Sequence, residues 1–224
     1  MAKRIYDNSG RTAEAENTRS QLIATARKIL SERSNRTPFS MDAVAKKAGV
    51  ARATVYLQFE NRGSLLEAVF DMIANEGGLR VLPEAFTEPD PVEALKKFTS
   101  VFVRFWIAQR EVWPRLSREL ADDEAVARLT ARSERRRRGI AVIVGRLAQK
   151  LTLHRADDLI DALHGMTSYE FIGQLIATER SEAEVETLML ELVEAVIRSL
   201  CFAKSKPLRN NEDSPVLANP RRTR

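Results

Sequence analysis

The chain has 224 residues, of which 44% are hydrophobic and 30% are charged, and its formal net charge is +5. This length and hydrophobic content support a folded core and argue against a disordered chain, and no apolar run is long enough for a membrane span. No apolar segment follows Lys3 and Arg4, and the single cysteine, Cys201, allows no internal disulfide. We therefore expect no secretory signal, no membrane partner, a reducing compartment and a cytoplasmic location.

The charges are unevenly distributed along the chain. Residues 1–62 hold 12 Lys and Arg against 6 Asp and Glu, whereas residues 63–202 hold 18 against 23. The last 22 residues are basic again, with 6 against 2. A basic N-terminal segment suits a polyanionic partner such as nucleic acid, because cationic side chains contact phosphates and release counterions.

The chain begins with a polar segment and continues with an amphipathic helix. Residues 1–16 are polar with several basic side chains, and predict a flexible basic arm. Apolar side chains then recur at helical spacing from about Thr18 to Ser31, which predicts a helix with one buried face.

Residues 39–59 predict two short helices joined by a tight turn. Ser40 can cap the first helix, and Gly49 can adopt the positive φ that ends it. In the second helix Val55 and Phe59 lie four positions apart on one buried face, so the polar side chains between them point elsewhere. Such a pair, with Arg, Thr and Tyr on the second helix, is typical of a helix-turn-helix that reads the DNA major groove.

Helical periodicity continues to about residue 201, and no segment has the alternation of a strand. Further helices are predicted over residues 62–76, 90–109, 113–120, 122–150, 155–178 and 181–201. We therefore predict an all-α protein with an N-terminal three-helix domain at residues 17–62 and a larger helical body at residues 63–203. Residues 204–224 are polar and without periodicity, and predict a disordered tail.

One motif within this arrangement resembles a known family. The pattern Ala48-Gly49-Val50-x-x-x-Thr54-x-Tyr56-x-x-Phe59, followed by Leu65-Leu66, resembles the DNA-binding domain of TetR/AcrR-family transcriptional regulators. The resemblance implies a homodimeric DNA-binding protein, usually a repressor, whose body at residues 63–203 binds an effector and forms the dimer. The effector would move the helix at residues 62–76, which links both domains, and so change the separation of the two recognition helices.

The resemblance also implies roles for particular residues. Arg52 and Thr54 lie early in the recognition helix and would reach base edges, whereas Tyr56 matches a phosphate-contacting tyrosine and Arg62 stands where a lysine is usual. Ala51 and Ala53 replace a common Ser and a frequent Gly, and Gln58 replaces an aromatic residue or His. The expected DNA contacts are Ser40, Arg52, Ala53, Thr54, Tyr56, Gln58 and Arg62.

An effector cavity is expected among the middle helices, where aromatic residues concentrate. This composition indicates an apolar or aromatic effector rather than a sugar phosphate, although any one aromatic can equally belong to the core. The expected lining residues are Phe102, Phe105, Trp106, Trp113, Leu116, His164, Met166 and Tyr169.

A run of arginines in the long helix at residues 122–150 has two interpretations. Arg132 and Arg135–Arg138 could form a second nucleic-acid patch, but four consecutive side chains point all round a helix. We interpret the run as a solvated stretch with ion pairs to neighbouring acids.

The helices at residues 155–178 and 181–201 present more apolar surface than one body can bury. This favours a homodimer through a four-helix interface formed by these last two long helices. Two recognition helices must then enter successive major grooves about 34 Å apart, which predicts a palindromic operator in double-stranded DNA.

Two alternative functions compete with this prediction, of which the first stays open and the second is disfavoured. One is a DNA-binding protein without an effector, either an activator or a nucleoid-associated protein. An all-α enzyme is disfavoured, because the chain has only two histidines, His154 and His164, and no HExxH, GxSxG or phosphate-loop motif. We expect neither a cofactor nor a metal site.

Overall fold

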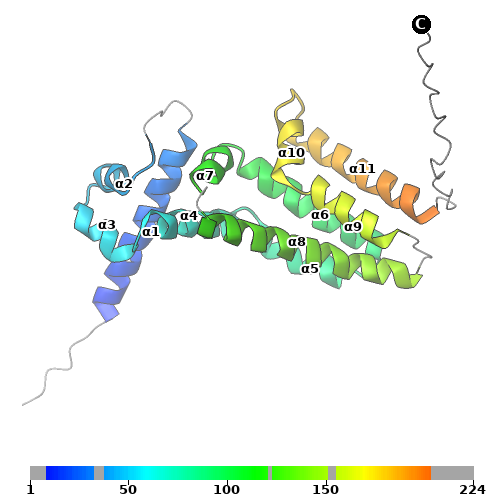
Figure 1. Cartoon of the computed structure of the whole chain (residues 1–224), viewed down its shortest axis with the longest axis horizontal. Coiled ribbons are helices and arrows are strands. Elements are labelled where there is room, and N and C mark those ends of the chain that lie inside the picture. The colour runs from blue at the N-terminus through cyan, green and yellow to red at the C-terminus, as the bar shows by residue number, and fades with distance from the viewer. Residues whose placement is uncertain (1–8, 33–37, 121–122, 151–154, 203–224) are drawn as a thin grey trace, which may run out of the picture.

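The computed structural model describes residues 9–32, 38–120, 123–150 and 155–202, and these residues form helices and turns without a strand (Figure 1). The all-α prediction is therefore confirmed. The elements are α1 (Ser9–Ser31), α2 (Met41–Ala48), α3 (Arg52–Gln58), α4 (Arg62–Glu76), the 3-10 turn η1 (Leu79–Val81), α5 (Leu82–Thr87), α6 (Pro91–Ala108), α7 (Trp113–Glu119), α8 (Asp123–Lys150), α9 (Ala156–Met166), α10 (Tyr169–Ile176) and α11 (Glu182–Phe202).

The molecule is elongated, with α1–α3 at one end and α5–α11 forming a bundle at the other (Figure 1). Helix α4 runs between the two parts. Leu65, Leu66 and Val69 of α4 are fully buried. Because α4 belongs to both packing units, a displacement of this helix reaches the helix-turn-helix directly.

Local capping signals in the sequence correctly predicted several helix ends. The Ser40 hydroxyl accepts a hydrogen bond from Ala43 N at 3.1 Å, and Gly49 ends α2 with φ of +70°. Asp90 caps α6 by accepting from Val92 N and Glu93 N at 2.9 and 3.0 Å. These groups satisfy backbone N–H donors that a helix end leaves without partners.

The first helix is longer than predicted. It begins at Ser9, so residues 9–16 extend α1 instead of belonging to a flexible arm at residues 1–16. Ala13, Glu14 and Ala15 are good helix formers that add further turns to the amphipathic segment behind them. Residues 1–8 and the tail predicted at 204–224 lie outside the described residues.

The helix predicted over residues 155–178 is broken in the structure. Helix α9 ends at Met166, and Ser168 begins α10 by accepting a hydrogen bond from Phe171 N at 3.3 Å. The buried Thr167 hydroxyl donates to Leu163 O at 2.9 Å, and Trp106 Nε1 donates to Thr167 O at 3.0 Å. The Trp106 contact comes from α6, so this part of the stabilisation is tertiary and periodicity does not report it.

No helix in the described part of the chain is long and apolar enough to cross a membrane.

Candidate nucleic-acid interface and internal cavity

The recognition helix α3 buries one face and exposes the other. Val55 and Phe59 are 0% and 1% exposed, whereas Tyr56 is 43% exposed. Most of the predicted DNA contacts lie on this helix: Arg52, Ala53 and Tyr56 are exposed, and Thr54 and Gln58 are half-buried. The structure thus brings five of the seven expected residues together on one short helix.

Arg52 is held by two neighbours on the DNA-facing end. Its Nε lies 2.9 Å from Asp42 Oδ1, and its Nη2 donates to Tyr56 Oη at 3.3 Å. The hydrogen bond with Tyr56, followed by the charge of Asp42, raises the pKa of Arg52 above its usual value. A bidentate base contact through Nε and Nη2 would require Arg52 to leave Asp42 and Tyr56, because those donors are already engaged.

Helix α1 supports the C-terminal end of α3. The Arg19 guanidinium lies over the Phe59 ring at 4.2 Å from its centroid, and its Nη1 donates to Gln58 O at 2.6 Å. This contact satisfies a carbonyl at the end of a seven-residue helix that has no side-chain cap at Ala51. The orientation of α3 therefore depends on Arg19.

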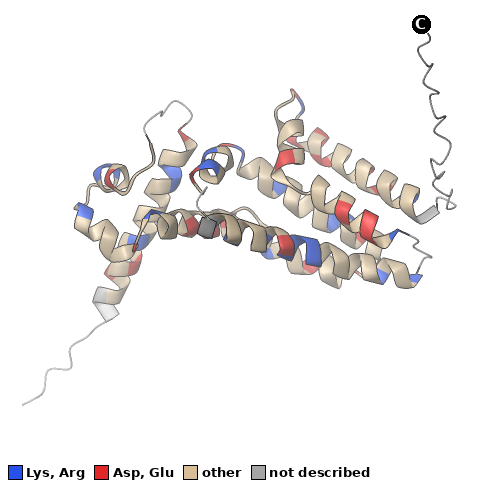
Figure 2. Cartoon of the chain, viewed as in Figure 1, with Lys and Arg blue, Asp and Glu red and all other residues tan. Residues whose placement is uncertain are grey.

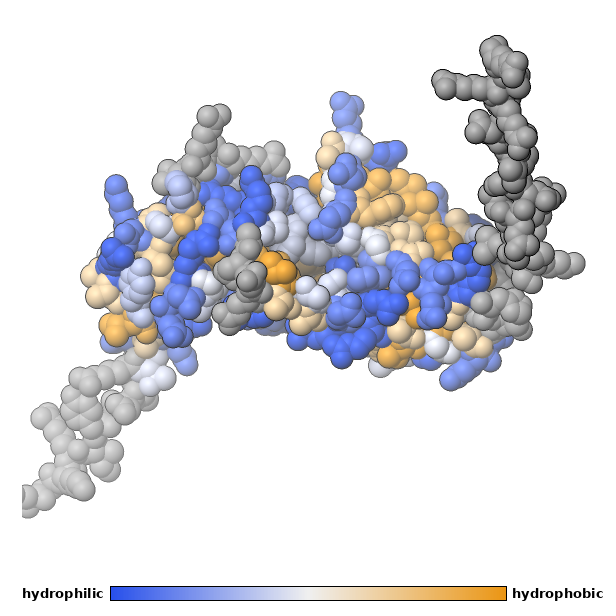
Figure 3. Space-filling model, viewed as in Figure 1, coloured by the Kyte–Doolittle hydropathy of each residue, from blue (hydrophilic) through white to orange (hydrophobic). Residues whose placement is uncertain are grey.

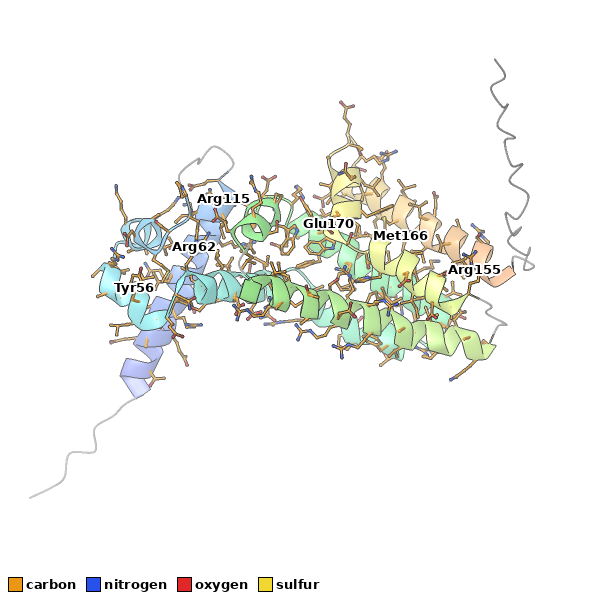
Figure 4. All side chains as sticks on the ribbon, viewed as in Figure 1. Tyr56, Arg62, Arg115, Arg155, Met166 and Glu170 are labelled. Carbon is orange, nitrogen blue, oxygen red and sulfur yellow. The ribbon has the colours of Figure 1, made fainter. Side chains whose placement is uncertain are left out.

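Arg62 has different partners from those expected of a phosphate contact. Its guanidinium forms an ion pair with the Glu119 carboxylate of α7, and it donates to Phe39 O at 3.3 Å and Glu119 O at 3.1 Å. Figure 4 places Arg62 and Arg115 at the junction of the two domains. In this structure the Arg62 donors bind α7 and the Phe39 carbonyl, so a phosphate contact by Arg62 stays a prediction that would require it to leave these partners.

One exposed residue on α3 was missed from the sequence. Leu57 is 84% exposed and lies beside Tyr56 in the helix. A protruding apolar side chain on a recognition helix is suited to the methyl group of thymine. Helical periodicity could have predicted the exposure of Leu57, because this residue does not share the helix face of Val55 and Phe59.

The helical body contains a cavity of about 650 Å³, a size typical of small-molecule sites. Five of the eight predicted lining residues border it: Phe102, Phe105, Trp106, Trp113 and Tyr169. The other three do not. Leu116 and Met166 are buried in the core and do not line the cavity. His164 does not line it either, but it contacts the lining residue Ser133.

The cavity wall is a series of aromatic contacts drawn from four helices. Trp106 and Trp113 have ring centroids 5.0 Å apart, and Tyr169 lies 5.4 Å from Trp106. Phe70 of α4 meets Trp113 edge-on at 5.7 Å. Edge-to-face and tilted aromatic pairs of this kind fix ring orientation, so the wall is preformed.

Two glycines allow aromatic rings to approach the wall closely. A Cβ at Gly77 would lie 2.4 Å from Phe105 Cδ2, and a Cβ at Gly139 would lie 3.0 Å from Phe98 Cε2. Gly77 ends α4 and Gly139 lies within α8. Neither glycine was recognised from the sequence as part of the cavity.

The arginine run in α8 makes the predicted ion pairs with acids, at Asp71 and Asp161, but it is not solvated throughout. Arg132, Arg135 and Arg136 line the cavity, whereas Arg137 makes an ion pair with Asp161 at 2.7 Å. Arg132 and Arg136 are four positions apart and therefore share the inward face of α8. The cavity therefore has a cationic side, which the aromatic composition of the predicted lining did not indicate.

A second hollow, of about 840 Å³, lies at the domain junction between α1, α7 and α10. Its wall is mostly polar and includes Glu32, Arg110, Arg115 and Glu119. The 650 Å³ cavity is better suited to a small organic molecule, because mostly apolar walls with a few polar groups are typical of small-molecule sites. Among the described residues, no group of three His, Cys, Asp or Glu could hold a metal ion.

The exposed α3, supported by α1 and α2, defines a helix-turn-helix DNA-binding protein. Comparison with known families agrees: residues 22–69 match the model of the bacterial regulatory proteins of the tetR family. Residues 22–69 therefore form a DNA-binding domain of the tetR-family type, and this match indicates a regulator of transcription rather than an enzyme.

Solved structures agree with this family at the level of the fold. A TetR-like transcriptional regulator from Rhodococcus sp. RHA1 has a TM-score of 0.64 and 20% identity, over 83% of this chain and 97% of that chain. A TetR-family transcriptional regulator from Thermus thermophilus has a TM-score of 0.60 and 17% identity, over 80% and 94%. A transcriptional regulator from Aquifex aeolicus has a TM-score of 0.60 and 16% identity, over 80% and 99%. No curated protein matches the chain by sequence.

Proposed function

We propose that this regulator represses transcription by binding a palindromic operator as a homodimer, and that a small molecule in the 650 Å³ cavity releases it. The observation that carries this proposal is the position of α7. One end of this helix contributes to the cavity wall, and its other residues hold the DNA-binding domain.

The cavity end of α7 is Trp113, whose ring contacts Phe70, Trp106 and Tyr169. A ligand in the cavity would contact these rings, and one that binds better with the Trp113 ring displaced would favour that displaced position. Trp113 is the first residue of a helix of only seven residues. A displacement of its ring therefore moves the whole helix.

The junction side of α7 holds the DNA-binding domain at two points. Arg115 Nη1 donates to Ile29 O near the end of α1 at 3.0 Å, and Glu119 pairs with Arg62 at the start of α4. Six residues of α-helix span about 9 Å, so Trp113 and Glu119 belong to one short rigid element. A ligand that prefers the displaced position of α7 would shift the population toward a state in which α1 and α4 are reoriented.

The DNA-facing surface proposed here consists of Ser40 and the residues of α3, and Arg62 lies at the junction of the two domains. Arg52, Thr54 and Gln58 would read bases, and Tyr56 would contact phosphate. Ser40 would add a phosphate contact at the start of α2, where helix N–H groups and the dipole favour an anion. Ala53 lets the DNA backbone approach the helix closely.

The proposed dimer forms through α10 and α11, the C-terminal part of the predicted four-helix interface. Figure 3 shows hydrophobic surface over α11, and Phe171 of α10 is 38% exposed. Leu175, Leu192 and Val196 of these helices are only partly buried. A continuous apolar face of this kind is suited to a second copy of the same chain, which would bury it symmetrically.

The test begins with the DNA sites of the purified full chain, selected from fragmented genomic DNA. We expect few sites, each with two half-sites one helical turn apart and occupied by two chains. Small-molecule fractions from cell extract are then added to this complex and DNA release is followed by fluorescence anisotropy. We expect release with the wild type but not with Leu129→Trp, which fills the cavity.

Many dispersed sites without a palindrome would contradict the proposal and favour an architectural role. Equal release of the wild type and of Leu129→Trp would contradict the cavity as the effector site.

A further inference from the structure

The cavity wall combines aromatic rings with an arginine face of α8. Basic side chains gather along the middle of this helix (Figure 2). Arg132 and Arg136 point inward, while Arg137 binds Asp161 and Arg138 Nε donates to Glu134 O at 3.4 Å. The inward pair is therefore distinct from the outer part of the same run.

Arg132 is already neutralised within the protein. Its Nη2 lies 2.8 Å from Asp71 Oδ1, and its guanidinium lies over the Phe70 ring at 4.0 Å from the centroid. Burial lowers the pKa of Arg132, and the Asp71 carboxylate opposes that effect. This arginine has a complete set of partners and needs no ligand.

Arg136 lacks such a partner. Its guanidinium lies 5.6 Å from the Phe102 ring centroid, and its Nε is buried without a hydrogen-bond partner. Among the described residues no carboxylate forms an ion pair with it. Burial lowers the pKa of Arg136, and the charge of Glu170, which is near but not in ion-pair contact, opposes that effect. Burying a guanidinium without an ion-pair partner lowers the stability of the folded protein. A role in binding an anion would explain why Arg136 lies at the cavity.

The contact of Arg136 with His164 orients the guanidinium without neutralising it. Arg136 Nη2 lies 3.3 Å from His164 Nε2, and Ser133 Oγ lies 2.9 Å from the same nitrogen. A guanidinium can only donate, so this nitrogen accepts and the ring is neutral. His164, predicted as a lining residue, thus positions a lining residue from behind.

We propose that the effector of this regulator is an amphipathic organic monoanion, whose carboxylate or similar anionic group binds Arg136 while its apolar body lies among Phe102, Trp106 and Trp113. This inference rests on the proposed effector function of the cavity. Arginine binds planar anions through two parallel hydrogen bonds, and such pairing is strong where water is excluded.

Arg135 also lines the cavity but is exposed, so the less exposed part of the lining favours an effector with one negative group. Glu170 in the first turn of α10 lines the cavity and is exposed (Figure 4), and Asp71, which pairs with Arg132, lines it as well. A second anionic group on the ligand would meet one of these carboxylates and be repelled. We therefore expect a monoanion to bind better than a sugar phosphate or a polyphosphate.

Two probes with one aromatic body test the inference without DNA. They are 8-anilino-1-naphthalenesulfonate, an aromatic monoanion, and N-phenyl-1-naphthylamine, which lacks the sulfonate. The two tryptophans of the chain both line the cavity, so energy transfer from Trp106 and Trp113 reports binding there. We expect the full-length wild type to bind the sulfonate at least about tenfold more tightly than the neutral amine.

Arg136→Gln should remove about that tenfold preference and leave the affinity for the neutral amine unchanged. Arg138→Gln is the matched control, because this exposed neighbour contacts only its own helix, and it should keep the wild-type preference. The thermal midpoint of Arg136→Gln without ligand should equal or exceed that of the wild type, since the variant removes an uncompensated buried charge.

Equal binding of the two probes, binding of neither probe, or equal weakening of both by Arg136→Gln would overturn the inference. Failure of the proposed function is a separate outcome. If the sulfonate binds through Arg136 but no cavity ligand alters the affinity for operator DNA, the anion site stands and the effector function does not.

Discussion

The Arg62 guanidinium at the start of α4 is bound by the Glu119 carboxylate at the end of α7, which joins the DNA-binding domain to the helical body. Arg62 was expected to contact phosphate, and a substitution of its partner distinguishes the two roles. If Arg62 holds the junction, Glu119→Gln and Arg62→Ala remove the same interaction and should have similar effects. If Arg62 binds phosphate, Glu119→Gln should leave DNA affinity unchanged or raise it.

We expect both junction variants to reduce the effect of a cavity ligand on operator affinity, by roughly fivefold or more if the pair carries a typical coupling free energy. Ligand affinity measured without DNA should not change. The measurement is operator binding by fluorescence anisotropy at several ligand concentrations. Glu111→Gln, in the turn before α7, serves as a control for removal of one carboxylate nearby.

Arg52 should determine sequence preference, and its ion pair with Asp42 should limit DNA affinity. Arg52→Ala is expected to relax preference at one base pair, with a loss of about 1–3 kcal/mol of discrimination. Asp42→Asn should raise DNA affinity, because it frees Arg52 and removes a negative charge near the phosphates. Both are measured with a set of operators that differ at single positions, and Asp42→Asn weakening binding would contradict this role.

Tyr56→Ala should weaken binding to all DNA sequences alike, because phosphate contacts carry no sequence information directly. Tyr56 is 43% exposed and the core face of α3 is formed by Val55, so the loss of DNA affinity is not expected to come from a disturbed core. Circular dichroism checks that the domain remains folded. A change confined to one base position would instead show that Tyr56 reads a base.

Gly77 should tolerate no larger residue. A Cβ there would lie 2.4 Å from Phe105 Cδ2, so Gly77→Ala is expected to destabilise the protein by about 1–3 kcal/mol through overpacking. Gly145→Ala is the matched control, because a Cβ at this α8 position meets nothing within 4 Å. It should stabilise the helix by about 0.5–1 kcal/mol. Urea unfolding measures both, and equal effects would contradict the packing argument.

The free energy of unfolding should fall as the pH drops below about 6.5. Burial, followed by the charge of Arg136, lowers the pKa of His164 from its ordinary value of 6.5. Below pH 6.5 the unfolded chain therefore binds a proton that the folded chain does not, and this favours unfolding until the folded-state pKa is reached. The slope stays below about 1.4 kcal/mol per pH unit, the limit for one proton.

His164→Gln should remove this part of the pH dependence, measured by urea unfolding between pH 5 and 8. His154→Gln, a change of the other histidine in the chain, serves as the control. Identical pH profiles for the wild type and His164→Gln would contradict the assignment.

Phe171→Glu should convert the proposed dimer to a monomer, because it places a charge in an interface that has to be dry at its centre. Val126→Glu on α8 is the control, since Val126 is also an exposed apolar residue, at 48% against 38% for Phe171. Light scattering after size exclusion gives the mass of each. If the Phe171→Glu variant is still a dimer, the interface does not include this part of α10.

Much of the local structure could be derived from the sequence because its causes are local. The cap at Ser40, the turn at Gly49 and the start of α6 at Asp90 depend on side chains within a few residues of the backbone groups they satisfy. The buried face of α3 follows from helical periodicity in the same way. These features identified the helix-turn-helix and the class of protein.

The site in the body depended on contacts between distant segments, which periodicity does not report. The break at Thr167 is stabilised by Trp106, 61 residues away in the chain, and Arg62 binds Glu119 instead of an open surface. Arg136 reads in the sequence as one of four equivalent arginines, and only the packing of α8 turns it inward while Arg137 faces Asp161. The sequence by itself determined the helix-turn-helix and which face of α3 is exposed, because backbone capping and amphipathicity are local. The tertiary structure alone decided which charges were buried together, because desolvation and ion pairing depend on what surrounds a side chain in space.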